Sequence, residues 1–98
     1  VHKDPYVTAT FGLYQLREGN FDKSRRYYLD AVSLLSDRKT KNRFRQRMNL
    51  EFGKYFLRQG KYSTARRLLL KSKSEPLGIK YAKEEAEAIL HELLSKKQ

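Results

Sequence analysis

Cysteine and tryptophan are both absent from this 98-residue chain, and only two prolines occur. Without cysteine there is neither a disulfide framework nor a thiolate metal site, which excludes small scaffolds held together by cystines or zinc. Long apolar stretches are also missing, because the longest aliphatic run is Leu68-Leu69-Leu70 and a bilayer span needs roughly 20 residues. We therefore expect one soluble domain over residues 1–98, with no membrane partner and a cytoplasmic location.

Acidic residues are scarce in one part of the chain. Residues 38–73 contain thirteen Lys/Arg against Glu51 alone, whereas residues 1–37 contain five of each sign and residues 74–98 contain four against five. The net charge of +11 therefore belongs to the middle of the sequence. Such a basic surface attracts acidic partners or polyanions, although a solvated face that keeps a small protein soluble has the same composition.

An internal repeat with a period of 41 residues runs through the chain. When residues 11–29 are aligned with residues 52–70, nine of the nineteen positions are identical. The identical pairs are Phe11/Phe52, Gly12/Gly53, Tyr14/Tyr55, Leu16/Leu57, Arg17/Arg58, Gly19/Gly60, Arg25/Arg66, Arg26/Arg67 and Leu29/Leu70. A period of this length is typical of helical units that stack on one another.

Apolar residues recur at helical spacing in five segments, and no segment shows the alternation of a strand. We expect helices over about 5–18, 21–35, 40–59, 63–73 and 79–95. Asp4 suits the N-cap of the first helix, Thr40 that of the third, and Gly19 and Gly60 suit left-handed helix ends. The prediction is an all-α fold with two helix-turn-helix units, residues 5–36 and 41–77, and a capping helix over residues 78–95.

The third expected helix has two stripes when its residues are placed at 100° intervals. One stripe is apolar and is expected in the core: Phe44, Met48, Phe52, Tyr55 and Phe56. The other is basic with leucines embedded in it: Arg43, Arg47, Leu50, Lys54, Leu57 and Arg58. Because the second stripe is too charged for a core and too apolar to serve solubility alone, we expect it to bind a partner.

The two units resemble tetratricopeptide repeats over residues 5–36 and 46–77. The matching positions are Thr8, Phe11, Gly12, Gln15, Gly19, Phe21, Ser24, Tyr28 and Ala31, then Asn49, Phe52, Gly53, Phe56, Gly60, Tyr62, Ala65, Leu69 and Ser72. The resemblance implies an α-solenoid of two helical hairpins, with the fifth helix as the family's capping helix. The sequence departs from the family where Thr8 and Asn49 are polar and Gln15 replaces an aromatic residue. The period also exceeds the family's roughly 34 residues, so seven extra residues lengthen the helices or form a loop around residues 36–43.

This resemblance implies a non-catalytic protein–protein interaction module, a scaffold or adaptor that holds a ligand in the groove lined by its A helices. The implied groove residues are Tyr6, Ala9, Leu13, Leu16 and Arg17, then Arg47, Leu50, Lys54, Leu57 and Arg58, and Arg43 joins them from the basic stripe. The Lys and Asn that grip a C-terminal carboxylate in part of the family are replaced by Ala9, Leu13 and Glu51. We expect a protein or peptide with acidic and apolar residues, held by arginines and leucines.

Two other partners stay open. Nucleic acid is the alternative ligand of segment 38–73, because Asn42 and Phe44 lie among the cations of residues 38–45, although no recognised nucleic-acid motif occurs. A homodimer through an uncapped repeat edge is the other, because repeat arrays need about three units to bury a continuous core. No enzyme activity, metal or cofactor is expected, since His2 and His91 are isolated and no phosphate-binding motif is present.

Overall fold

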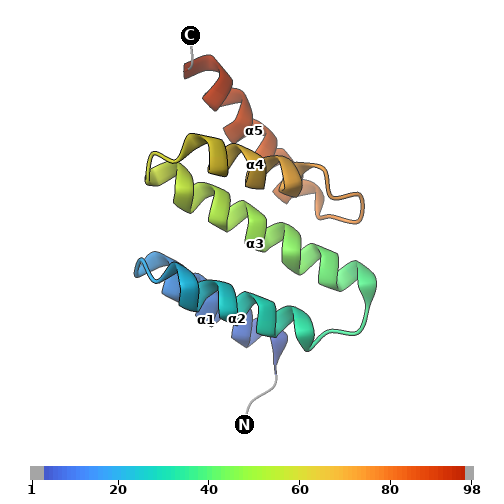
Figure 1. The fold of residues 1–98 in the computed structure, drawn as a ribbon. Helices are drawn as coiled ribbons and strands as arrows, with labels where there is room; N and C mark the ends of the chain where they lie inside the picture. Colours follow the sequence, from blue (N-terminus) through green and yellow to red (C-terminus); the bar gives the residue numbers. More distant parts are fainter. Residues whose placement is uncertain (1–3, 97–98) are drawn as a thin grey trace.

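Five α-helices follow one another in the computed structural model, which describes residues 4–96: α1 (Pro5–Arg17), α2 (Phe21–Ser33), α3 (Arg38–Arg58), α4 (Tyr62–Lys73) and α5 (Lys80–Lys96). No strand occurs in that range, so the all-α prediction is confirmed. Helices α1 and α2 form one hairpin, α3 and α4 form a second, and α5 follows (Figure 1). These units stack into an elongated molecule of 50 × 29 × 16 Å, with α1 and the end of α5 at opposite ends. None of the described helices is both long and apolar enough to cross a membrane.

The start of α1 and the ends of α1 and α3 agree with the sequence signals. The Asp4 carboxylate accepts a hydrogen bond from the backbone N–H of Tyr6 at 2.8 Å, and Pro5 occupies the first helical position. Gly19 and Gly60 follow the last turns of their helices with φ angles of +83° and +76°. Only glycine adopts this left-handed conformation without a steric cost, which explains why both repeats have glycine there.

The prediction that Thr40 caps α3 is wrong. The helix begins at Arg38, and its N-cap is Asp37, whose carboxylate accepts hydrogen bonds from the Thr40 N–H at 2.8 Å and the Thr40 hydroxyl at 2.7 Å. These two bonds lower the pKa of Asp37 below its ordinary value of 3.8. The connection between α2 and α3 spans only residues 34–37, whereas α3 has 21 residues. The extra residues of the 41-residue period therefore mainly lengthen α3 and do not form a loop.

Gly12 and Gly53 allow the two helices of each hairpin to approach closely. A Cβ atom on Gly53 would lie 2.8 Å from Cγ of Leu69, and one on Gly12 would lie 2.9 Å from Cδ2 of Tyr28. Both distances are too short for carbon atoms, so a larger residue would push the helices apart. The matched positions on α2 and α4 are buried as the repeat pattern predicts: Ser24, Tyr28 and Ala31, then Ala65, Leu69 and Ser72.

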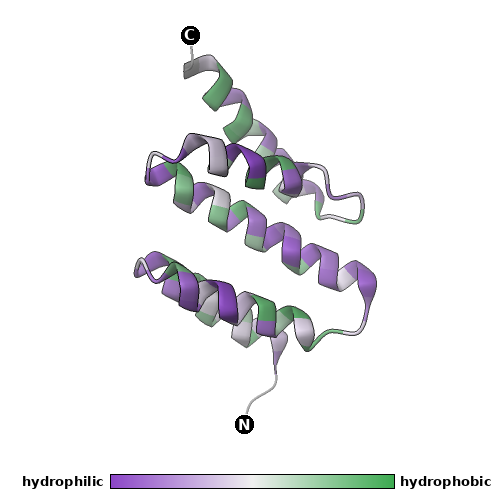
Figure 2. Cartoon of the chain, viewed as in Figure 1, coloured by the Kyte–Doolittle hydropathy of each residue, from purple (hydrophilic) through white to green (hydrophobic). Residues whose placement is uncertain are grey.

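Aromatic rings join the first hairpin to α3. The Phe21 ring centroid lies 4.8 Å from that of Phe52, 5.8 Å from Tyr55 and 5.0 Å from Phe56, and the Tyr28 ring meets Phe52 edge-on at 5.6 Å. Phe52 therefore lies in the core as predicted, and Met48 and Tyr55 pack against it, while Phe44 and Phe56 of the same stripe are half-buried. The first half of α3 is mostly hydrophilic (Figure 2), so these ring contacts are concentrated in its second half.

The basic stripe of α3 is partly covered by the chain's own fifth helix. Leu50 is only 2% exposed and belongs to a core cluster with Leu69 of α4 and with Ala82, Ala86 and Leu90 of α5. The expectation that Leu50 contacts a partner is therefore corrected: α5 takes that place. The other end of the predicted α5 stripe is less buried than expected, because Leu94 is 56% exposed.

A buried glutamine fixes the connection between α4 and α5. The Gln46 amide nitrogen donates to the carbonyl oxygens of Ser72 at 3.1 Å and Ile79 at 3.3 Å, and its amide oxygen accepts from the Ile79 N–H at 2.7 Å. The Ser72 hydroxyl donates in turn to the Gln46 carbonyl at 3.1 Å. A Cβ on Gly78 would lie 2.7 Å from Cδ of Gln46, so a larger residue there would displace the glutamine amide from this network. This network fixes where α5 begins.

Candidate partner-binding groove

A cavity of about 380 Å³ lies between α1 and α3, near the first residues of α5. We call it the basic groove. It is lined by Tyr6, Ala9, Thr10, Leu13, Tyr28, Thr40, Arg43, Phe44, Arg47 and Ile79. The lining contains two arginines and no carboxylate, and the rest is mainly apolar or aromatic.

The apolar wall of the basic groove is built across the two hairpins. Tyr6 of α1 and Phe44 of α3 meet edge to face, with ring centroids 5.1 Å apart. Tyr6 is 65% exposed, while Leu13 and Phe44 are half-buried. Exposed aromatic surface beside half-buried aliphatic surface suits the burial of a ligand's apolar side chain.

The two arginines are held in place by the connection to α5 and by α5 itself. Arg43 donates from Nε to the carbonyl oxygen of Leu77 at 3.1 Å. Arg47 donates from Nη1 to the Tyr81 hydroxyl, and its guanidinium carbon lies 5.7 Å from the Tyr81 ring centroid. Among residues 4–96, neither arginine has a carboxylate within 4.0 Å. The groove is therefore electropositive, and hydrogen bonds hold both of its guanidinium groups in position.

One donor in the basic groove has no acceptor. The Nε atom of Arg47 is buried and makes no hydrogen bond with any described residue. Leaving a buried N–H without a partner costs free energy, roughly 1–3 kcal/mol for a protein donor. Because this atom is not exposed, a carboxylate in the groove would meet Arg47 at its other N–H groups and would reach Nε only after the side chain moved.

Tyr28 contributes a neutral phenol to the lining. Burial above all, together with the nearby Glu51 carboxylate, raises its pKa from 10.0 to about 12, while Arg47 and Arg17 act in the opposite direction. The phenol consequently stays protonated at physiological pH. It adds no negative charge that would offset the arginines.

The residues expected to bind a partner are divided among several places. Five of them line the basic groove: Tyr6, Ala9, Leu13, Arg43 and Arg47. Leu16 is buried like Leu50, so neither leucine is available to a ligand. Lys54 is already paired, with its Nζ 2.8 Å from Glu85 of α5 and 3.6 Å from Glu51.

The remaining three lie elsewhere. Arg17 is exposed in the last turn of α1. Leu57 and Arg58 line a different cavity, between α4 and α5. Helix α5 separates Leu57 and Arg58 from the basic groove, because it contacts α3 at Lys54 and Leu50, which lie between them and Arg47.

Sequence reasoning missed several residues that line the groove. Phe44 was assigned to the core stripe, yet it borders the cavity opposite Tyr6. Thr10, Thr40 and Ile79 join it because α1, the start of α3 and the start of α5 meet there. No local sequence signal identifies that meeting point, since it depends on how three segments pack together.

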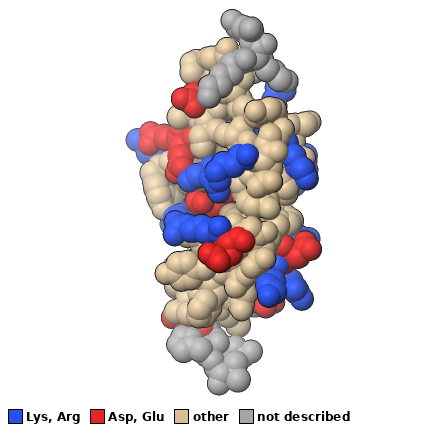
Figure 3. Space-filling view, turned by 90° about the vertical axis from the view of Figure 1, so that its left-hand side faces the viewer, with Lys and Arg blue, Asp and Glu red and all other residues tan. Residues whose placement is uncertain are grey.

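Acidic and basic side chains are interspersed on the face where the two hairpin turns lie (Figure 3). That face is therefore not one continuous basic patch. Across residues 4–96, no group of three or more His, Cys, Asp or Glu side chains is placed to hold a metal ion. His91 is exposed on α5, and His2 lies outside the described residues.

Comparisons of the chain with protein-family models, with curated protein sequences and with solved structures found no match.

Proposed function

We propose that this chain is a non-catalytic protein–protein interaction module, a tetratricopeptide-like scaffold or adaptor located in the cytoplasm. It binds an acidic, partly apolar peptide or protein surface in the basic groove. The observation that carries the proposal is the groove's lining, which combines two oriented arginines with aromatic and aliphatic surface and contains no carboxylate. A ligand with carboxylates beside a large apolar residue matches both halves of that surface.

Arg47 is the residue on which recognition depends most in this proposal. Its position is fixed by Tyr81, so little side-chain entropy is lost when a ligand binds. Its guanidinium lines the groove with no carboxylate partner among residues 4–96, so a ligand carboxylate adds a charge-assisted contact there. Arg43 supplies a second charge one helical turn away on the same helix.

The experiment is a titration of a fluorescein-labelled ten-residue peptide that alternates glutamate with leucine and phenylalanine. We expect Arg47→Gln to weaken binding by roughly tenfold, Arg43→Gln by somewhat less, and Leu13→Ala by about fivefold. The matched control is Arg45→Gln, because Arg45 is an exposed arginine on the same helix and does not line the groove. It should change the affinity by less than about twofold.

Two results would refute the groove proposal. One is an equal loss of affinity in Arg45→Gln and Arg47→Gln, which would mean that only overall charge matters. The other is equally tight binding of a peptide with lysine in place of glutamate. Circular dichroism of each variant checks that it is folded. Leu50→Ala is unsuitable for this test, because Leu50 is buried and its truncation would report stability.

A further inference from the structure

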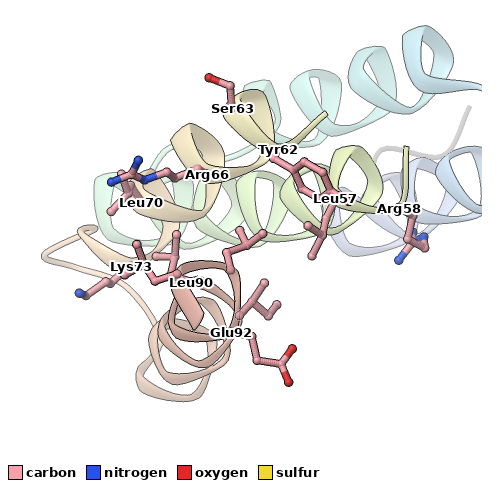
Figure 4. A pocket seen from close by; sticks show the side chains of 12 residues that line it. Leu57, Arg58, Tyr62, Ser63, Arg66, Leu70, Lys73, Leu90 and Glu92 are labelled. Atoms are coloured by element: carbon pink, nitrogen blue, oxygen red, sulfur yellow. The ribbon is translucent and has the colours of Figure 1, made fainter. Parts of the chain in front are cut away.

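Both ends of the stacked helices expose large apolar side chains that the basic groove does not use. At the first end, Val7, Phe11 and Tyr14 lie on one stripe of α1 and are 40%, 50% and 55% exposed. We call this stripe the α1 edge. At the other end, a cleft of about 620 Å³ opens between α4 and α5 (Figure 4). We call it the α4–α5 cleft, and its apolar surface consists of Leu57, Tyr62, Leu70, Ile89, Leu90, Leu93 and Leu94.

The two ends carry repeat counterparts of a contact that the chain makes internally. Phe21 and Phe52 pack together at 4.8 Å where the first hairpin meets α3. Phe11 lies 41 residues before Phe52, and Tyr62 lies 41 residues after Phe21, so each is the repeat counterpart of one partner. Both counterparts are at least half exposed. The two surfaces therefore carry, at matching repeat positions, aromatic side chains like those that pack together at the internal interface.

The α4–α5 cleft is open because α5 carries smaller side chains than α3. Phe21 is surrounded by three aromatic rings of α3. Tyr62 instead shares its cleft with the aliphatic residues Ile89 and Leu90, and it stays 55% exposed. Helix α5 is also inclined to α4 (Figure 1), which leaves room at the side where Tyr62 lies. Aromatic side chains such as those of the α1 edge suit this space.

Charge favours the same pairing. Arg66 and Lys73 lie at one end of the cleft and Arg58 at the other (Figure 4), with Glu92 as a carboxylate in the lining. The stripe of the α1 edge continues to the exposed carboxylate of Glu18. Residues 1–37 have no net charge, so this docking avoids the repulsion between two copies of segment 38–73, each of which carries +12.

We propose that the α1 edge of one copy of this chain docks into the α4–α5 cleft of a second copy, head to tail. The two surfaces differ, so the contact is heterologous and leaves a free edge and a free cleft at the ends of every assembly. Chains of copies therefore lengthen as the concentration rises. The contact is smaller than a standard interface, so half-association falls at about 0.1 mM.

Sedimentation velocity over about 0.02–1 mM tests this assembly with two blocked variants. Phe11→Glu blocks the edge and Leu70→Glu blocks the cleft, and both replace exposed residues. The wild-type mass should rise without a plateau, and each variant alone should stay monomeric. An equimolar mixture of the two should form a 1:1 dimer and nothing larger. Leu29→Glu, which alters the exposed repeat counterpart of Leu70, should assemble like the wild type.

Three outcomes overturn the proposal: a wild-type monomer over the whole range, a plateau at a dimer that persists in Phe11→Glu, and a mixture of folded variants that stays monomeric. The second would indicate a symmetric dimer. Arg47→Gln should assemble like the wild type, because Arg47 lines neither surface. Assembly and peptide binding therefore fail or succeed independently.

Discussion

Tyr28 is the residue at which the core and the basic groove meet. Its ring packs on Phe52 and approaches Gly12, while its side chain also lines the groove. The sequence comparison of the two units placed it at a matching position of the second helix, and in the structure it is buried. That its side chain also lines the groove was not predictable from the sequence, because this depends on how α1, α2 and α3 pack together.

The raised pKa of Tyr28 makes the stability of the fold depend on alkaline pH. Because the folded state raises this pKa from 10.0 to about 12, the stabilisation is fully present below pH 10 and is lost as the pH rises through 12. We expect the difference in unfolding free energy between the wild type and Tyr28→Phe to change by about 2 kcal/mol between about pH 9 and pH 11.5. Urea denaturation of both proteins measures it.

Lysine side chains also titrate in this pH range, but they do so equally in the wild type and in Tyr28→Phe. The difference in unfolding free energy between the two proteins therefore reports the titration of Tyr28 alone. Parallel pH profiles for the two proteins would contradict the assignment. They would mean that the folded state tolerates the phenolate as well as the unfolded chain does.

At the scale of helices, the arrangement depends on Gln46 more than the sequence indicates. A single glutamine within a charged segment looks like a solvated residue. In the fold it is 1% exposed and holds the α4–α5 connection by three hydrogen bonds. By contrast, the glycine turns, the aromatic stripe of α3 and the small residues of α2 and α4 all follow from local pattern, and the structure confirms them.

Gln46→Leu should destabilise the protein by about 2–3 kcal/mol, because it leaves the N–H of Ile79 without its acceptor in a part-buried position. Chemical denaturation gives the free energy, and hydrogen exchange at the Ile79 amide should become faster. The control is Gln59→Leu at the exposed end of α3, which should shift stability by less than about 0.5 kcal/mol. Equal effects of the two substitutions would exclude a special role for Gln46.

Helix α5 explains why part of the predicted site is not available to a partner. The sequence predicted that the basic stripe of α3 binds something acidic and partly apolar. Helix α5 has that character, and it takes much of the stripe through Glu85 and the alanines that cover Leu50. Only the N-terminal part, with Arg43 and Arg47, stays open beside α1. Periodicity assigns a residue to a face of its helix, but it does not state which element covers that face.

For the whole molecule, the main question is how a chain of net charge +11 selects its ligand. Nucleic acid would use the cations of segment 38–73 collectively. The basic groove instead offers two oriented arginines and an apolar wall, and on the face of Figure 3 opposite charges are mixed. These alternatives predict different dependence on salt, because binding along a nucleic-acid backbone releases many counterions, whereas two arginine contacts release few.

The most direct measurement is the affinity of the labelled glutamate–leucine–phenylalanine peptide and of a twenty-nucleotide oligothymidylate across about 0.05–0.5 M NaCl. We predict a log–log slope of about −1 to −2 for the peptide, with binding retained at the highest salt, and a slope of about −4 or steeper for the oligonucleotide. A peptide slope as steep as that of the oligonucleotide would contradict the basic groove as a peptide site. So would an oligonucleotide that binds more tightly than the peptide at about 0.15 M salt and displaces it.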